Sequence, residues 1–401
     1  MHYIEVGTQN YRRVIVSMLL GSIVTFAVLY GPQVLIREFS REFNVSPSSA
    51  GNIISFSTFT LAVAMLFVSI FSDAWGRKAI MCSSLFMTSM FTVLSSFSPS
   101  FPWLLAFRLL EGLSLAGFPA IAMAYLNEEV SPGSVGRVMG IYVSGTAVGG
   151  FLGRVLISVL TEFFSWKISL LVLGLCSLGC SLLFWILLPK SSHFQPRRIS
   201  LTHAISGFGA GLANKKLLSL YMIGFLLLGT YVTLFNYLGF PLSRPPYDLS
   251  QTVIGLLFVF QLVGSWSSIW FGRWADRYSR SLLILCGITC QLVGSLVTLY
   301  GNIWLTIVGI TLYACGFFAG HTVASGWVGR IAPAGHKSQA SSLYLLFYYT
   351  GSSLVGWLGG QFLGAYGWIG VVLFLCGLLL LMAALLKPLW IAGEKRASAI
   401  K

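Results

Sequence analysis

Twelve long apolar runs divide this chain, and they constrain its fold more than any other feature of the sequence. A helix needs about 20 consecutive apolar residues to cross the hydrocarbon core of a bilayer. Six such runs precede a polar stretch and six follow it, at about residues 14–36, 48–71, 79–97, 102–126, 135–160, 166–188, 217–240, 250–271, 281–300, 303–329, 338–364 and 367–387. The sequence therefore predicts an all-α membrane protein with twelve transmembrane helices.

Charged residues are too scarce to cover a water-exposed surface. They make up 9% of the chain, against about 25% in ordinary soluble domains. The net charge of +14 fits either a nucleic-acid partner or basic loops on one side of a membrane. Because the Lys and Arg residues lie in short loops between the runs, we favour basic loops and expect no nucleic-acid partner.

The distribution of the basic residues predicts the orientation. An even number of spans places both termini on one side. With the termini inside, the inner segments hold nineteen of the 25 Lys and Arg residues, and the outer loops hold four. Basic residues concentrate in cytoplasmic loops, so we expect both termini in the cytoplasm. The first run is too long for a signal-peptide core and is expected to remain as the first span.

A polar stretch at residues 189–216, rich in Pro, Ser, Gly and basic residues, separates the two sets of runs. We interpret it as a cytoplasmic linker between an N-terminal half, residues 1–188, and a C-terminal half, residues 217–401. A short charged loop occurs once in each half. Asp73 is followed four residues later by Arg77, and Asp276 is followed in the same way by Arg280. Such loops indicate equivalent turns in two repeats of one membrane protein.

Twelve spans, a central linker and this duplicated loop resemble the major facilitator superfamily, whose loop pattern is roughly Gly-x-Leu-Ala-Asp-Arg-x-Gly-Arg-Lys. The first copy differs from it at Ser69, Phe71 and Ala74, and matches at Asp73, Gly76, Arg77 and Lys78. The second copy has Ser279 for the later Gly, and matches at Gly272, Ala275, Asp276, Arg277 and Arg280. The resemblance covers essentially the whole chain and implies the major facilitator fold, two six-helix pseudo-repeats.

The resemblance also implies a gating role for these loops. Asp73, at a helix end, can accept backbone N–H groups and pair with Arg77 or with the end of a neighbouring span. Such contacts would hold the cytoplasmic side shut and would break when the transporter switches. The alternative is that these residues are ordinary cytoplasmic loop charges.

Two further patterns resemble the drug:proton antiporter branch. Arg108-Leu-Leu-Glu111-Gly112 in the fourth span is similar to an Arg-x-x-Gln-Gly pattern, with Glu111 in place of Gln. In the fifth span, residues 145–150 resemble the Gly-Pro-x-x-Gly-Gly antiporter motif without its Pro. The missing Pro leaves the direction of transport open.

Three charged residues, Arg108, Glu111 and Arg154, lie well inside predicted spans and away from their ends, where a charge needs a partner or a wet cavity. Arg108 and Glu111 are three residues apart and share a helix face. We expect the three to form one cluster, with the carboxylate between two guanidinium groups. The cluster either couples protonation to transport, and then suits an anionic substrate, or is a fixed structural pair. His321 in the tenth span is either a proton carrier or a packing residue.

Small and aromatic residues complete the candidate site. Glycines four residues apart suggest close helix packing, or a sliding interface between the halves, at Gly145, Gly149 and Gly153 with the adjoining Gly150, and at Gly356, Gly360 and Gly364. A cavity for an amphipathic organic molecule is expected to be lined by Asn236, Gln261, Tyr348 and Tyr349, among other aromatic residues. The alternative is that these aromatic residues simply pack.

We therefore predict a proton-coupled secondary transporter of the bacterial inner membrane, working by alternating access on a small organic solute. Efflux is the first interpretation, and uptake of a sugar or organic acid is the alternative. A membrane sensor or scaffold without transport is the alternative from another class, which the membrane-buried charges disfavour. The chain has no phosphate-binding loop, zinc-protease motif or nucleophile elbow, so we expect no enzyme activity. No cofactor, metal or oligomer is expected.

Overall fold

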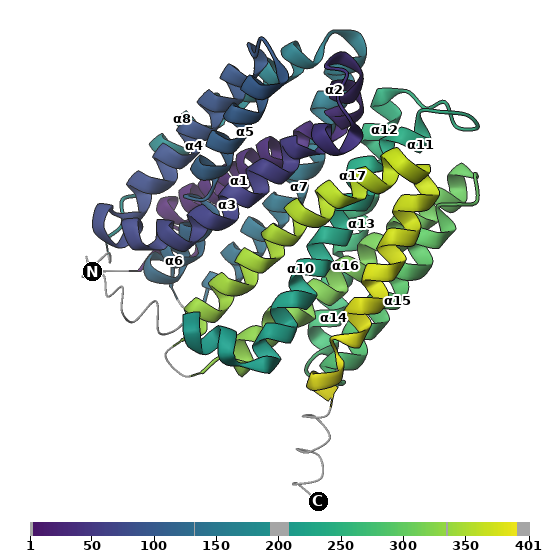
Figure 1. Cartoon of the computed structure of the whole chain (residues 1–401). Coiled ribbons are helices and arrows are strands. Elements are labelled where there is room, and N and C mark those ends of the chain that lie inside the picture. The colour runs from purple at the N-terminus through teal and green to yellow at the C-terminus, as the bar shows by residue number, and fades with distance from the viewer. Residues whose placement is uncertain (1–2, 132, 193–207, 334–335, 391–401) are drawn as a thin grey trace, which may run out of the picture. The chain divides into compact units, whose positions relative to one another are not determined.

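The structure is a computed structural model, which describes residues 3–131, 133–192, 208–333 and 336–390; the side chains of residues 69–75 and 338 are outside this description. The described chain is almost entirely helical (Figure 1). Eleven helical stretches within it are long and apolar enough to cross a membrane. One of them, Gln339–Trp390, covers nearly all of α17, Lys337–Ala384, whose 48 residues are about twice the length that one crossing needs.

Gly367 divides α17 into two spans. Its backbone angles, φ 65° and ψ −158°, are not helical, and the positive φ suits a glycine because it has no Cβ. Counting α17 twice gives twelve crossings among the described residues. The predicted all-α fold with twelve transmembrane helices is confirmed.

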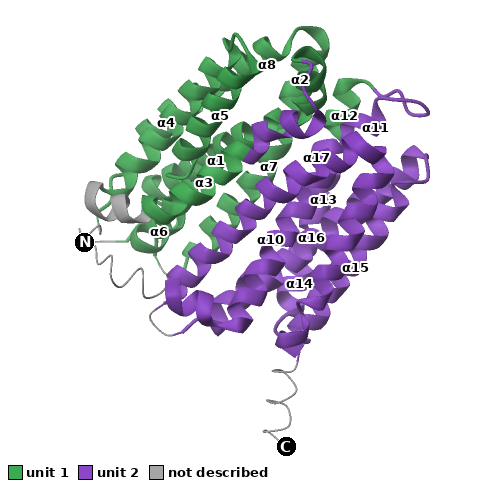
Figure 2. Cartoon of the chain, viewed as in Figure 1, with its two compact units in different colours: residues 1–43, 56–199, 250–256 green, residues 44–55, 200–249, 257–401 purple. Residues whose placement is uncertain are grey.

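The chain forms two compact units (Figure 2). Unit 1 consists of residues 1–43, 56–199 and 250–256, and unit 2 of residues 44–55, 200–249 and 257–401. Relative to the predicted halves, each unit takes one short segment from the other half of the sequence. The halves at residues 1–188 and 217–401 remain a prediction about the repeat, and most of the predicted linker lies outside the described residues.

Unit 1 is built around the first helix. Here α1 packs against α7 and α8, and α4 packs against α5 and α8. The helices of this part of the chain are α1 (Gln9–Tyr30), η1 (Gly31–Leu35), α2 (Ile36–Glu42), α3 (Pro47–Trp75), α4 (Arg77–Ser96), α5 (Phe101–Leu115), α6 (Pro119–Glu129), α7 (Val135–Phe163), α8 (Trp166–Leu187) and α12 (Gln251–Leu257). The first residues of α3 belong to unit 2.

Unit 2 is built around α10 and α16. Helix α10 packs against α17 and α16, and α16 also packs against α15, α13 and α14. Besides α17, the helices of unit 2 are α10 (Lys215–Tyr237), α11 (Gly239–Leu242), α13 (Val259–Ser265), α14 (Ser267–Trp274), α15 (Arg280–Val297) and α16 (Ile303–Ile331).

Local sequence explains where several helices begin. Thr8 Oγ1 accepts a hydrogen bond from Tyr11 N at 3.2 Å, and Asn302 Oδ1 accepts one from Trp304 N at 2.9 Å. Both are N-cap residues with extended backbone, which supply acceptors for N–H groups that have no partner in the helix. Gly76, with φ 91°, separates α3 from α4, and Pro119 begins α6 after a short turn.

Large apolar side chains remain exposed on the outer faces of the helices. On α8 they are Leu182, Leu183, Trp185 and Ile186, and the last of these is 72% exposed. A water-soluble surface rarely carries contiguous apolar side chains of this size. In a membrane they face lipid chains, so the exposed residues agree with the predicted bilayer surroundings.

Candidate transport site

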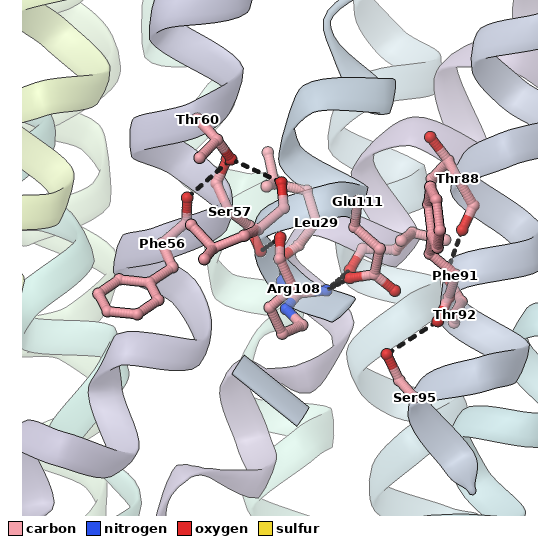
Figure 3. A network of polar contacts seen from close by, with 12 residues as sticks. Leu29, Phe56, Ser57, Thr60, Thr88, Phe91, Thr92, Ser95, Arg108 and Glu111 are labelled. Carbon is pink, nitrogen blue, oxygen red and sulfur yellow. Dashed lines mark hydrogen bonds and ion pairs between the residues drawn. The ribbon is translucent and has the colours of Figure 1, made fainter. Parts of the chain in front are cut away.

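The charged centre of unit 1 is the ion pair between Arg108 and Glu111 on α5 (Figure 3). Arg108 Nη1 donates to Glu111 Oε2, and the two side chains are 2% and 1% exposed. The spacing of three residues brings them together on one helix face, as the sequence predicted. A pair this deeply buried keeps its charges only with further hydrogen bonds.

Arg108 obtains those further bonds from α1. Its Nη1 donates to the Val28 carbonyl at 3.1 Å, and its Nη2 donates to the Leu29 carbonyl at 3.0 Å. These acceptors lie in the last turn of α1, where backbone carbonyls have no intrahelical partner and carry partial negative charge. The guanidinium group therefore links the end of the first span to the fourth.

Helix α3 fixes α5 from another side. Ser57 Oγ donates to the Arg108 carbonyl at 2.8 Å, and the Thr60 hydroxyl is shared between the Leu109 carbonyl at 3.0 Å and the Phe56 carbonyl of its own helix at 2.9 Å (Figure 3). Gly112 permits this approach, since a Cβ there would collide with the Ser57 carbonyl and the Thr60 hydroxyl. The backbone that carries Arg108 is thus held firmly, which positions its side chain.

Glu111 has one carboxylate oxygen that is not used in this network. Oε1 is buried and has no hydrogen-bond partner among the described residues. Thr92 on α4 lies close enough to interact with Glu111, but its hydroxyl donates to the Thr88 carbonyl at 2.9 Å. A buried carboxylate oxygen without a donor is a place where a proton can be held.

A kink in the fourth span follows soon after Glu111. Helix α5 ends at Leu115, and α6 begins at Pro119. Proline has no N–H group and disturbs the preceding turn, which explains the kink. Irregular backbone at membrane depth is tolerated where protein surrounds it.

Arg154 on α7 binds other partners. Its Nε donates to Gln33 Oε1 at 2.8 Å, its Nη1 donates to the Gly150 carbonyl at 2.9 Å, and its guanidinium carbon lies 5.2 Å from the centre of the Tyr30 ring. The ion pair of Glu111 in the described chain is with Arg108. The expected cluster, with a carboxylate between two guanidinium groups, is therefore corrected to two separate sites. The reason is the fold, which places η1 and the end of α1 beside Arg154.

His321 lies on α16 in unit 2. Its Nδ1 is 3.0 Å from Tyr344 Oη, and its ring centre is 4.6 Å from that of Tyr348. Tyr348 in turn packs edge-on against Tyr349 at 5.3 Å. The structure brings three of the predicted residues, His321, Tyr348 and Tyr349, into one group.

The two predicted polar lining residues are both buried. Asn236 on α10 is 3% exposed, and Gln261 on α13 is 8% exposed. Gln261 Nε2 has no hydrogen-bond partner among the described residues. Such a donor needs a partner in a membrane protein, so Gln261 remains a candidate for contact with a solute.

The duplicated loops tie each unit together at equivalent places. In unit 1, Arg77 donates to both carboxylate oxygens of Glu128 on α6, at 2.8 and 3.2 Å. In unit 2, Arg330 on α16 donates to Asp276 at 2.8 Å. Arg280 lies close enough to interact with both of these residues.

The remaining loop residues are positioned as follows. Lys78 donates to the Leu188 carbonyl, and Gly76 supplies the positive φ at the start of α4. The side chain of Asp73 is outside the described residues. Gly272 and Arg277 lie at and just after the end of α14. A gating role for these loops remains a prediction.

The glycines of the fifth span pack α7 onto α1. A Cβ at Gly149 would lie 2.6 Å from Ile23 Cα, and one at Gly153 would lie 2.6 Å from Ala27 Cα. Gly145 meets Ser22 in the same way. All these residues belong to unit 1, so the interpretation of this stripe as a sliding interface between halves is corrected to close packing within one unit.

The glycines of the eleventh span behave less uniformly. A Cβ at Gly360 would lie 2.7 Å from Ser48 N, one at Gly356 would lie 3.6 Å from Asn236 Nδ2, and one at Gly364 would meet nothing within 4 Å. Gly360 therefore requires its small size, whereas Gly364 does not. Ser48 and Asn236 also belong to unit 2.

Two residues important for these contacts were missed from the sequence, Glu128 and Arg330. The sequence does contain a signal for both residues. Each lies near the end of the fourth span of its half, and each is opposite in charge to the loop residue it binds, Arg77 or Asp276. The donors Ser57 and Thr60 and the acceptor Gln33 were also missed. Polar residues of this kind occur throughout the spans, so the sequence does not single them out.

Buried charges inside a helical membrane protein of twelve spans define the class of a solute transporter. The sequence model of the Major Facilitator Superfamily matches residues 18–244 and 242–400. The chain therefore belongs to this family, whose members are transporters and not enzymes.

The relatives of the chain agree with this membership. It is 44% identical over 393 residues to the uncharacterized MFS-type transporter YybF of Bacillus subtilis (strain 168), covering 98% of this chain and 96% of that one. It is 42% identical over 384 residues to the inner membrane transport protein YnfM of Escherichia coli (strain K12), covering 96% and 91%.

A solved structure is similar in fold. The crystal structure of a bacterial homologue of the human lysosomal transporter Spinster, in an inward-facing and occupied conformation, matches with a TM-score of 0.76. The match covers 94% of this chain and 96% of that one, at 15% sequence identity. At this identity the similarity shows the fold alone.

Proposed function

We propose that this transporter couples the movement of a small organic solute to protons and works by alternating access in the bacterial inner membrane. The observation that carries the proposal is the buried Arg108–Glu111 pair with its unused oxygen, Glu111 Oε1. Ionizable residues inside spans are costly and usually mark ion or substrate pathways. A static pair would gain stability from a donor at that oxygen, whereas a proton-binding group must leave it available.

The network gives protonation a structural consequence. A proton on Oε1 neutralizes Glu111 and removes the negative charge that Glu111 presents to Arg108. Its hydrogen bonds to the carbonyl groups of Val28 and Leu29 do not depend on the charge of Glu111. The Arg108–Glu111 ion pair therefore depends on the protonation state, and this dependence can bias a conformational equilibrium.

Efflux by antiport is the direction that we propose, because the pattern around Arg108 and Glu111 resembles that of drug:proton antiporters. Uptake of a sugar or organic acid is the alternative. We further propose that both termini lie in the cytoplasm, because of the bias in Lys and Arg, and that one chain transports without a partner.

The test uses inside-out vesicles with an imposed proton gradient. Lumenal pH is followed while cationic dyes, organic acids and sugars are added to vesicles with the wild type, Glu111→Gln or Glu42→Gln. Glu42 is exposed at the end of α2 and serves as the matched control. We expect one class of compound to collapse the gradient with the wild type and Glu42→Gln, and not with Glu111→Gln.

Other outcomes contradict the proposal in different ways. If Glu111→Gln responds like the wild type, Glu111 is a structural residue and does not couple protons. If no compound moves protons with the wild type, proton-coupled antiport is wrong. Uptake or a role without transport then becomes the better interpretation.

A further inference from the structure

Five rings in unit 2 form a continuous group, which we call the aromatic cluster: Tyr231 on α10, Phe317 and His321 on α16, and Tyr344 and Tyr348 on α17. The rings of Tyr231 and Phe317 are stacked with centres 3.9 Å apart. Those of Phe317 and His321 are nearly parallel at 5.9 Å, and those of Tyr344 and Tyr348 are stacked at 5.9 Å.

The sequence explains how the cluster forms. Phe317 and His321 are four residues apart on α16, and Tyr344 and Tyr348 are four residues apart on α17. Side chains at this spacing lie one above the other on a single helix face. Two such faces meet when α16 and α17 pack together.

The nearly parallel rings of the aromatic cluster favour a planar aromatic ligand. Aromatic cages for cations place ring faces around an empty centre. In the aromatic cluster several ring planes are close to parallel, since those of Phe317 and His321 differ by 10° and those of Phe317 and Tyr348 by 23°, while those of His321 and Tyr348 differ by 31°. A stack of rings is extended most favourably by another planar ring.

His321 gives the cluster a polar group that is partly exposed. One nitrogen, Nδ1, lies 3.0 Å from Tyr344 Oη, and the other, Nε2, makes no hydrogen bond to a described residue. The residue is deeply surrounded by protein, yet its side chain is only half-buried. The other four residues of the cluster are at most 8% exposed, so His321 is its most exposed member.

The charges of unit 2 favour one class of solute over another. Its membrane-spanning stretches contain neither Asp nor Glu; they are Lys215–Leu242, the part of Gln251–Trp274 from residue 257 onward, Arg280–Val297, Ile303–Ile331 and Gln339–Trp390. The described acidic residues of this unit, Asp248 and Asp276, lie in connections between helices. An organic cation would find no counter-charge beside His321, whereas an anion would meet a hydrogen-bond donor when Nε2 carries a proton.

We infer that the aromatic cluster binds a planar aromatic solute with an anionic acceptor group, such as a carboxylate, whose ring stacks on Tyr348 while the acceptor binds His321. The inference rests on the proposed transport function, because it names the class of solute. It requires no proton gradient, so binding at equilibrium tests it separately from coupling.

The experiment measures binding to the purified full chain in detergent by calorimetry. The probes are benzoate, cyclohexanecarboxylate and benzyltrimethylammonium, which separate the ring from the charge. Stacking of one ring contributes up to about 1.5 kcal/mol, which corresponds to a change in Kd of about tenfold. We expect benzoate to bind about tenfold more tightly than cyclohexanecarboxylate, and benzyltrimethylammonium not to bind.

Variants then locate the site. Tyr348→Leu and His321→Phe should each weaken benzoate binding about tenfold. The matched control is Tyr366→Leu, since Tyr366 lies on the same helix, is 68% exposed and is not part of the cluster. Size-exclusion elution and thermal unfolding show whether each variant is folded.

The comparison of probes on the wild type needs no variant and decides the question if a variant fails to fold. Equal binding of the two carboxylates, tighter binding of the cation, or no measurable binding of benzoate overturns the inference. So does wild-type affinity in folded Tyr348→Leu and His321→Phe. Intact benzoate binding without proton movement in vesicles would leave the site correct and the coupling wrong.

Discussion

The membrane interiors of the two units differ in chemistry. Unit 1 buries Arg108, Glu111 and Arg154, each less than 5% exposed. Unit 2 buries rings, and His321 is held by the neutral hydroxyl group of Tyr344. Two pseudo-repeats of similar architecture can therefore bury different chemistry, with an ion pair in one and a cluster of aromatic rings in the other. Losing a partner destabilises a buried charge more than it destabilises a buried ring, because the unpaired charge remains inside the protein.

The largest expected effect comes from removing one partner of the buried pair. Arg108→Met leaves Glu111 without its cation and should lower the free energy of unfolding by about 3 kcal/mol. His321→Phe in unit 2 removes one neutral hydrogen bond and should cost about 1 kcal/mol. Denaturant unfolding of the purified proteins in detergent measures both values.

A double variant tests whether the unpaired charge causes the loss of stability. Arg108→Met combined with Glu111→Met removes both charges, so the double variant should be more stable than Arg108→Met alone. Equal losses of stability in Arg108→Met and His321→Phe would show that the buried charges of unit 1 are no more demanding than the rings of unit 2.

The second prediction concerns packing, in which we expect the units to be alike. Gly149→Ala would place Cβ 2.6 Å from Ile23 Cα, and Gly360→Ala would collide with Ser48. Each should lower the free energy of unfolding by about 2 kcal/mol, because the helices must move apart.

Each unit supplies a matched control for this prediction. A Cβ at Gly140 on α7 or at Gly364 on α17 meets nothing within 4 Å. Gly140→Ala and Gly364→Ala should therefore leave the midpoint temperature of thermal unfolding unchanged or raise it slightly. If these two variants lose as much stability as Gly149→Ala and Gly360→Ala, close helix approach is not the reason for the glycines.

The smallest expected effects come from the loop ion pairs, which have opposite polarity in the two units. The loop supplies the cation Arg77 to Glu128 in unit 1, and the anion Asp276 to Arg330 in unit 2. The first pair is bidentate and has side chains 12% and 31% exposed, whereas those of the second are 61% and 65% exposed. A double-mutant cycle to Ala should give a coupling energy of about 1 kcal/mol for the first pair and about 0.3 kcal/mol for the second.

The salt dependence of the coupling energy should also differ between the two ion pairs. The coupling energy of the exposed pair, Asp276–Arg330, should vanish at about 1 M salt, where charges are screened within about 3 Å. That of Arg77–Glu128 should persist in part. A coupling energy in unit 2 equal to that in unit 1 would show that solvent exposure does not set the strength of these pairs.

Much of the fold was predictable from the sequence, because the bilayer imposes simple rules. Lipid offers no hydrogen bonds, so each long apolar run must be a helix, and the runs can be counted directly. The count also separated the last two runs, at residues 338–364 and 367–387, and Gly367 with its positive φ lies at that boundary. The approach of Arg108 to Glu111 was also predictable, because residues three apart on one helix are neighbours whatever surrounds them.

Only the tertiary structure decided which distant residues meet. It separated Arg154 from the Arg108–Glu111 pair and gave it Gln33 and Gly150 instead. It paired Arg77 with Glu128, 51 residues away, and brought His321 to Tyr344 and Tyr348. The sequence by itself determined the helices, the duplicated loops and the local pair, because these depend on local spacing and on the solvent. The partners across helices depend on packing, and no spacing along the chain specifies which helix faces meet.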